Sequence, residues 1–382
     1  MNEKYGTIDP VDLAISLVRI PSYEKEKPIA EFIKSLLEEL GFNVRLDEVQ
    51  ADRPNVTAVL ESGTAGPILM YCGHLDTVPP ASFSQLKPEV RNGKLVGRGS
   101  ADMKSGVSAM LSTLNYFAAN KDEWSGKIIF LGTMGEEIGL LGMNHFVKNN
   151  LYGNKIDACI IGEPTSLDIG IAHKGMAWLQ LNTMGKEAHS SKPYQGVNAI
   201  YHMALIVKAL EENLKFLLEK HTHPLLGTPT VNVSIIHGGK RANMVPHECV
   251  IEIDRRVLPG EILEAVLEEI KATIDPLKNE YPQLSYELSV KKYNGPFEIK
   301  SDEKFIETVA DAVSFCLARR PEIKGLSFGT DASELSVMNI PTVVIGPGSP
   351  NQAHKEEEWI DIEEIRSAFE IYKQIGLSYL SK

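Results

Sequence analysis

Histidine and carboxylate side chains, which bind metal ions and move protons, follow four short apolar runs in this sequence. The runs are 68–72, 127–131, 157–161 and 342–345. The residues that follow them, in chain order, are His74, Asp76, Glu136, Glu137, Glu163 and His354. A fifth segment, 97–106, carries Asp102 just ahead of an expected helix.

Each of these residues, taken alone, has an ordinary structural explanation. A Glu–Glu pair is most often a solvated surface feature, and Asp102 fits the N-cap of the helix that follows it. Two histidines and several carboxylates at four successive strand ends are nevertheless hard to obtain by chance. Carboxylates that lie so close together must share protons or share a metal ion. Histidine combined with carboxylate favours zinc, manganese or cobalt over calcium.

The four apolar runs lack polar alternation, which is typical of strands buried on both faces of a sheet between helices. Apolar residues repeat with helical spacing over 29–40, before Gly41, and over 107–117, and 303–317 is also expected to be helical. We therefore predict an α/β fold with a mixed, mostly parallel sheet between helices. Ligands of such sheets bind beyond the carboxyl ends of the strands, so the polar residues after the runs should meet at one edge.

The region from 176 to 292 contains strands of another kind, because apolar and polar residues alternate along them. Such strands have one buried and one solvated face. With helices expected near 197–218 and 261–275, the order is strand, helix, strand, strand, helix, strand, which is the ferredoxin-like arrangement. We predict that residues 1–175 and 293–382 form one domain and that residues 176–292 are an α+β domain inserted into it.

The bulk composition limits the classes of partner. The chain has 382 residues, a length that favours two domains. Its net charge of −12 opposes binding to phosphate backbones, so nucleic acid is not an expected partner. The N-terminal residues have no signal-peptide pattern, and no stretch reaches the roughly 18 apolar residues of a membrane span. We therefore expect a cytoplasmic protein with no membrane partner.

Five motifs occur in an order that resembles one enzyme family over almost the whole chain: HLDTVP, GRGSADMKSG, GEEIG, GEP and NQAH. The family is that of the co-catalytic metallopeptidases, which include acetylornithine deacetylase, succinyl-diaminopimelate desuccinylase, aminoacylase and glutamate carboxypeptidases. The resemblance implies a zinc-exopeptidase-like catalytic domain. It also implies that the inserted domain is a lid and dimerisation domain, so a homodimer is expected.

The resemblance implies two divalent metal ions, zinc first, with cobalt or manganese as alternatives. His74 and Glu163 would hold one ion, and Glu137 and His354 would hold the other. Asp102 would bridge the two ions. No ligand of the family pattern is missing from the sequence.

The resemblance also implies catalytic and substrate-binding residues. Asp76 would orient the imidazole of His74, Glu136 would be the general base, and His189 would stabilise the oxyanion that develops during the reaction. We expect a small-molecule substrate with a free carboxylate. Such a carboxylate needs a fixed cation, and arginine can bind it in a bidentate manner. The residues expected to contact this substrate are Asn243, Arg256 and Thr330.

Several functions remain open at this point. The segment GPGSPNQAH is most similar to acetylornithine deacetylases, which favours hydrolysis of an N-acyl amino acid. A dipeptidase or a glutamate-type carboxypeptidase is the alternative. A non-catalytic binding protein is less favoured, because the positions of the metal ligands and the base are all filled. Nucleotide binding is not favoured either, because neither a P-loop nor a dinucleotide-binding glycine motif occurs.

Overall fold

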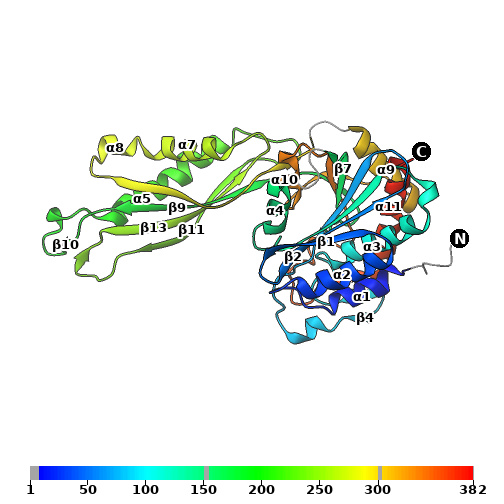
Figure 1. The fold of residues 1–382 in the computed structure, drawn as a ribbon. Helices are drawn as coiled ribbons and strands as arrows, with labels where there is room; N and C mark the ends of the chain where they lie inside the picture. The colour runs from blue at the N-terminus through cyan, green and yellow to red at the C-terminus, as the bar shows by residue number, and fades with distance from the viewer. Residues whose placement is uncertain (1–7, 150–154, 300–302, 382) are drawn as a thin grey trace. The chain divides into compact units, whose positions relative to one another are not determined.

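The computed structural model describes residues 8–149, 155–299 and 303–381 (Figure 1). The chain forms two compact units. The first consists of Met1–Ile171, Ile299–Lys324 and Thr330–Lys382, and the second of Ala172–Glu298 and Gly325–Gly329. The second unit thus extends beyond 176–292 at both ends and takes up a short segment that no sequence pattern assigned to it. Among the described residues, no helix is both long and apolar enough to cross a membrane.

The first unit is built on a mixed sheet. Its strands are β1 (Asn43–Gln50), β2 (Arg53–Glu61), β3 (Ile68–His74), β6 (Lys127–Thr133), β7 (Ala158–Ile161), β8 (Ile169–His173) and β17 (Thr342–Val344). They lie in the order β1-β2-β6-β3-β7-β17-β8. The four central strands, β6, β3, β7 and β17, are parallel to one another, whereas β1, β2 and β8 pair antiparallel. The prediction of an α/β fold with a mainly parallel central sheet is confirmed.

Helices of the first unit cover this sheet (Figure 1). They are α1 (Pro10–Val18), α2 (Lys27–Glu39), α3 (Lys104–Ala119), α4 (Leu141–Asn149), α9 (Glu303–Leu317), α10 (Ala332–Val337) and α11 (Ile362–Tyr379). Helix α3 packs against both α1 and α11 and is buried along almost its whole length. Its first turn touches the end of β7, since a Cβ atom at Gly106 would overlap the carbonyl oxygen of Gly162. This close approach brings the segment before α3, with Asp102, to the strand ends.

A small sheet also belongs to the first unit. It is formed by β4 (Glu89–Arg91), β5 (Lys94–Val96) and β18 (Trp359–Asp361), with β5 in the middle. The pairing of β5 with β18 joins the segment before Asp102 to the segment after His354. No sequence pattern predicted this sheet, because its strands are only three residues long.

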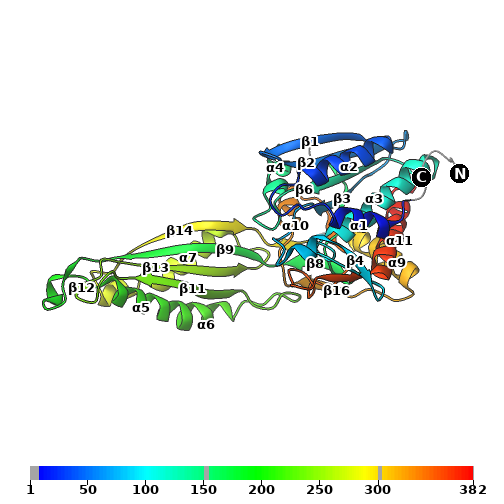
Figure 2. The same ribbon diagram turned by 90° about the horizontal axis from the view of Figure 1, so that it is seen from below.

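The second unit has the strand–helix order expected for the ferredoxin-like arrangement. Its main elements are β9 (Gly175–Met184), α5 (Ala199–Ala209), β11 (Thr230–Gly238), β13 (Glu248–Val257), α7 (Leu263–Ile274) and β14 (Ser285–Asn294). The strands are all antiparallel, in the order β11-β13-β9-β14, and α5 packs against the sheet (Figure 2). The helix expected over 197–218 is interrupted after α5 by a π-helical turn, Leu210–Leu214, before α6 (Lys215–Leu218).

In the second unit, the alternation of apolar and polar residues along the sequence corresponds to an alternation of buried and less buried side chains. Alternate residues of β9 and β13, such as Leu179 and Ile251, are fully buried and form the core of the second unit. The other short elements are α8 (Leu277–Glu280), β10 (Ala188–His189), β12 (Met244–Val245), β15 (Phe297–Glu298) and β16 (Ile323–Leu326).

Candidate metal centre

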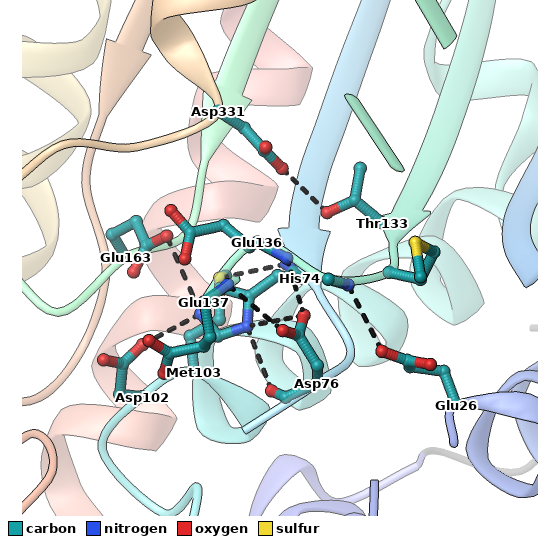
Figure 3. A network of polar contacts seen from close by, with 12 residues as sticks. Glu26, His74, Asp76, Asp102, Met103, Thr133, Glu136, Glu137, Glu163 and Asp331 are labelled. Atoms are coloured by element: carbon teal, nitrogen blue, oxygen red, sulfur yellow. Dashed lines mark hydrogen bonds and ion pairs between the residues drawn. The ribbon is translucent and has the colours of Figure 1, made fainter. Parts of the chain in front are cut away.

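The parallel strands of the first unit bring the predicted residues to one edge of the sheet. Strand β3 ends at His74, and Glu136 and Glu137 lie in the turn after β6. Glu163 follows β7, and His354 lies in the loop after β17. Since β6, β3, β7 and β17 are parallel, their carboxyl ends lie together. Figure 3 shows His74, Glu136, Glu137 and Glu163 in one cluster. His354 joins it through a contact with Glu137.

Asp102 lies between the two histidines. Its Oδ1 is 2.9 Å from Nε2 of His74, and its Oδ2 is 3.3 Å from Nε2 of His354. Nε2 of His74 is also 3.8 Å from Oε1 of Glu163, and Nε2 of His354 is 2.9 Å from Oε1 of Glu137. Each oxygen of Asp102 therefore belongs to a group of one histidine and one glutamate. This is the arrangement that a carboxylate bridging two cations requires.

Asp76 organises the cluster in two ways. Its backbone carbonyl lies 3.0 Å from Nδ1 of His74. A carbonyl oxygen only accepts, so Nδ1 carries the proton and the lone pair of Nε2 points to the cluster in the neutral imidazole. The carboxylate of Asp76 also accepts hydrogen bonds from the backbone N–H groups of Glu136 and Glu137, at 3.1 Å each. Asp76 was predicted to orient His74, and its carboxylate also holds the turn that carries both glutamates.

The electrostatics of the cluster are those of a site for cations. Burial and the neighbouring carboxylates raise the pKa of Glu136 and Glu163 well above the usual glutamate range, although His74 opposes the shift. Burial opposes protonation of His74, yet Glu163 and Asp102 raise the pKa of its imidazole. Hydrogen bonds to Asp102 and Glu137 raise the pKa of His354 to about 10. The raised pKa values favour protonation of these histidines and glutamates, which reduces the repulsion between the carboxylates. A bound cation would reduce the same repulsion and let the carboxylates stay ionised.

The donor set fits divalent transition metals. Ligand atoms of His74, Asp102 and Glu137 all lie within 4.8 Å of one another. Imidazole nitrogens and carboxylate oxygens suit zinc, cobalt and manganese. The residues would hold two ions, one between His74 and Glu163 and one between His354 and Glu137, with Asp102 shared.

Two buried residues support the turn after β6 and were not found from the sequence. Glu26 accepts the backbone N–H of Gly135 at 3.2 Å and forms an ion pair with Arg53. Asn55 accepts the backbone N–H of Met134 and donates to the carbonyl of Gly142. These contacts join segments far apart in the chain, so no local spacing marks them.

Asp331 is a third buried residue that sequence reasoning missed. It accepts a 2.7 Å hydrogen bond from the hydroxyl of Thr133, and burial raises its pKa to about 7. Its neighbour Thr330, and not Asp331, was predicted from the sequence to contact the substrate. Thr330 is fully buried, and its Oγ1 accepts the backbone N–H of Ala332 at the start of α10. Its predicted contact with a substrate stays a prediction.

His189 and Asn243 lie close together in the second unit. Strand β10, which ends at His189, pairs with β12, which begins directly after Asn243. The carbonyl of Asn243 accepts the backbone N–H of Ser190. The imidazole of His189 is exposed, and its Nδ1 lies 2.8 Å from the hydroxyl of Ser191.

Arg256 lies at the opposite end of β13 from Asn243. Asn243 precedes the start of this strand at Glu248, whereas Arg256 is its penultimate residue. At about 3.3 Å per residue, the strand separates the two by roughly 25 Å. Asn243 and Arg256, which were both predicted to contact the substrate, therefore lie far apart within the second unit, because an extended strand separates its two ends.

Arg256 lines a cavity of about 470 Å³ within the second unit. Lys174 lies at the same cavity, together with Leu225 and Leu226. Arg256 forms an ion pair with Asp254, with 2.9 Å between Nε and Oδ1. Burial and the two arginines Arg256 and Arg255 lower the pKa of Lys174.

At this edge of the sheet Asp102 lies between two histidines, and the nearby carboxylates complete a donor set suited to divalent metal ions. The chain belongs to Peptidase family M20/M25/M40, and the family pattern matches residues 70–377. Together with its relatives, this membership establishes a metal-dependent enzyme of the amidohydrolase and peptidase class.

Relatives cover nearly the whole chain. An acetylornithine deacetylase of Vibrio campbellii is 32% identical over 94% of this chain and 93% of its own length. One from Proteus mirabilis is 30% identical over 98% and 97%. Aminopeptidase PepT of Bacillus cereus has the same fold, with a TM-score of 0.81, 23% identity and coverage of 98% and 99%. The YXEP protein of Bacillus subtilis, a dinuclear metal binding peptidase of the M20 family, has a TM-score of 0.75, 16% identity and 97% coverage of both chains.

Proposed function

We propose that this protein removes the acyl group from an N-acyl amino acid by metal-dependent hydrolysis of the amide bond. The observation that carries the proposal is the position of Asp102, whose two oxygens each face one histidine. The relatives at about 30% identity are acetylornithine deacetylases, which supports an N-acyl amino acid as the substrate class.

The chain's own residues supply the proton chemistry. Divalent ions held by the five ligand residues would polarise the amide carbonyl and acidify a water molecule. Glu136 is the general base, which takes the proton of the attacking water and passes it to the departing amine. Burial raises the pKa of Glu136, which brings a carboxylate closer to the pKa that such proton transfers need. The turn held by Asp76 keeps Glu136 and Glu137 in fixed positions.

A dipeptidase or carboxypeptidase is the second candidate. Solved structures with this fold include an aminopeptidase and a human carnosine dipeptidase, but at 23% and 16% identity they support the fold alone. The reaction at the metal centre is the same for both candidates. They differ in the group on the acyl side of the bond.

Residues of the second unit complete substrate binding in our proposal. His189 donates a hydrogen bond to the oxyanion, and Arg256 binds the free carboxylate of the substrate. The unit serves as a lid and as the contact of a homodimer, since the outer strand β11 is largely exposed and an uncovered strand edge is a docking surface. We further propose that the protein acts in the cytoplasm.

Removal of metal is expected to abolish hydrolysis, and added Zn²⁺ should restore it. Elemental analysis of the active protein should find two transition-metal ions per chain, as in other two-metal hydrolases. A screen of N-acetyl amino acids, N-succinyl amino acids and dipeptides, each with zinc, cobalt and manganese, identifies the substrate class. Activity on dipeptides alone would favour the second candidate. Full activity without any transition metal would disprove the proposal.

Arg256→Lys is expected to raise KM for a substrate with a free carboxylate far more than for the corresponding amide. A guanidinium can bind a carboxylate through two parallel hydrogen bonds, whereas an ammonium is a point charge without this fork. The measurement is kcat and KM for one N-acyl amino acid and its carboxamide, with both proteins. Equal changes for the two substrates would show that Arg256 does not bind the carboxylate.

A further inference from the structure

Glu358 contacts the segment that carries Asp102. Its Oε1 accepts the backbone N–H groups of Ala101 at 2.9 Å and of Asp102 at 3.1 Å. Its Oε2 accepts a 2.5 Å hydrogen bond from Arg98. Its backbone carbonyl accepts the N–H of Gly97. We call the side chains of Glu358 and Arg98, with the two backbone N–H groups, the Glu358 clamp.

The clamp is a buried ion pair with two backbone contacts. The side chains of Arg98 and Glu358 are only 4% and 1% exposed. A buried ion pair contributes little net stability compared with an apolar pair, because desolvation of both charges offsets their attraction. Loss of one partner is costly, however, because it leaves an uncompensated charge in the interior. Stability of the fold alone therefore does not explain why two charges are buried here.

Contacts other than the clamp also hold these two segments together. Backbone pairing of β18 with β5 already joins them, with Trp359 opposite Val96 and Ile360 opposite Leu95. The side chain of Glu358 adds contacts beyond the end of this pairing, with the backbone N–H groups of Ala101 and Asp102. What the clamp specifically sets is the position of the Asp102 backbone.

That position decides the geometry of the cluster. The Asp102 carboxylate lies between Nε2 of His74 and Nε2 of His354, and its side chain is too short to compensate for movement of its own backbone. Glu358 also follows His354 by four residues. One C-terminal segment therefore supplies a histidine of the cluster and holds the carboxylate beside it.

We propose that Glu358 and Arg98 are positioning residues, which hold Asp102 at the place where its carboxylate can bridge two metal ions. This inference rests on the proposed role of Asp102 as the bridging ligand. Residues that orient metal ligands typically change metal affinity by about 10–100-fold when they are replaced. The clamp acts through the backbone of the ligand residue rather than through its side chain.

Glu358→Gln tests the clamp. The glutamine oxygen can still accept from the backbone N–H groups, but its NH₂ group then faces the N–H donors of Arg98. Titration of metal-free protein with Zn²⁺ is expected to give a Kd for at least one ion that is about 10–100-fold higher than in the wild type. The visible spectrum of the Co²⁺ form should change, since it reports the geometry of the ligands. The matched control is Glu356→Gln, an exposed glutamate of the same segment, which should leave the Kd unchanged.

The double variant Arg98→Met, Glu358→Gln provides the rescue. It removes the facing donors and the unpaired charge, while the glutamine oxygen still accepts from Ala101 and Asp102. Its Kd is expected to lie between those of the single variant and the wild type. If Glu358→Gln does not fold, the double variant carries the test alone, and a wild-type Kd in it would contradict the proposal.

Other outcomes separate this inference from the proposed function. If Glu358→Gln unfolds at a lower temperature but binds both ions with the wild-type Kd, the clamp is only structural and the inference is wrong. If metal binding depends on Glu358 while no N-acyl amino acid is hydrolysed, the inference stands and the proposed function fails. All titrations are made without substrate, so activity does not enter the result.

Discussion

Glu136→Gln is expected to lower kcat by about 10²–10⁴-fold, the loss that follows removal of a general base. Glu136 is half-buried beside the cluster, and its backbone N–H donates to the carboxylate of Asp76. Glutamine has nearly the same shape and keeps this backbone contact, but it cannot take a proton. Metal content should remain close to that of the wild type, because Glu136 is not one of the five ligand residues.

Glu137→Gln is the matched variant, since the two residues are neighbours of the same type. Glu137 lies 2.9 Å from His354, so its loss should empty or weaken one metal site. Excess metal should then partly restore activity, which it cannot do for Glu136→Gln. The experiment measures metal content and kcat for both variants side by side. If Glu136→Gln loses metal and Glu137→Gln retains it, the two roles are exchanged.

His189→Ala is expected to lower kcat by about 10²–10³-fold, the loss seen when one oxyanion donor is removed. The local structure prepares His189 to donate. The backbone N–H of Ser191 donates to Nδ1 of His189 at 3.2 Å, so Nδ1 must accept. In the neutral imidazole the proton is then on Nε2, which can donate a hydrogen bond to an oxyanion.

The control for this variant is His237→Ala. His237 is an exposed histidine of the same unit, on β11, and its replacement should leave kcat unchanged. Metal content should be normal in both variants, because neither residue belongs to the cluster. If His189→Ala turns over at a rate near that of the wild type, His189 has no role in catalysis.

A mixture of two inactive variants shows whether His189 acts on its own chain. If it acts across a homodimer, a mixture of equal parts of His189→Ala and Glu136→Gln should regain activity at about one quarter of the sites, since half of the dimers are mixed and one site in each is complete. If His189 acts within its chain, no mixed dimer regains activity. Sedimentation of the same samples reports whether dimers are present.

The sequence alone determined the elements with strong local patterns. The apolar repeat before Gly41 predicted α2, and Gly41 adopts the left-handed backbone, with φ of +84°, that ends a helix in this way. The four apolar runs became the four central parallel strands. The pattern works because burial on both faces demands continuous apolar residues.

The grouping of the histidines and carboxylates at one edge of the sheet could also be predicted, because parallel strands bring their carboxyl ends to one edge whatever lies between them in the chain. His74, Glu137, Glu163 and His354 each follow such a strand, and Asp102 precedes a helix buried against the same sheet. The residue types indicated metal binding, and the parallel arrangement of the strands was enough to bring these residues together.

Tertiary structure decided which groups hold the cluster in place. The carboxylate of Asp76 binds two backbone N–H groups of the neighbouring strand's turn, and Glu358 binds the N–H of Asp102 from a segment over 250 positions away. Thr330, predicted to contact substrate, is buried, and Asn243 is separated from Arg256 by the length of β13. Sequence patterns report periodic burial along one element. A hydrogen bond between distant segments depends on which segments the tertiary structure brings together, and the spacing of residues within one segment does not contain that information.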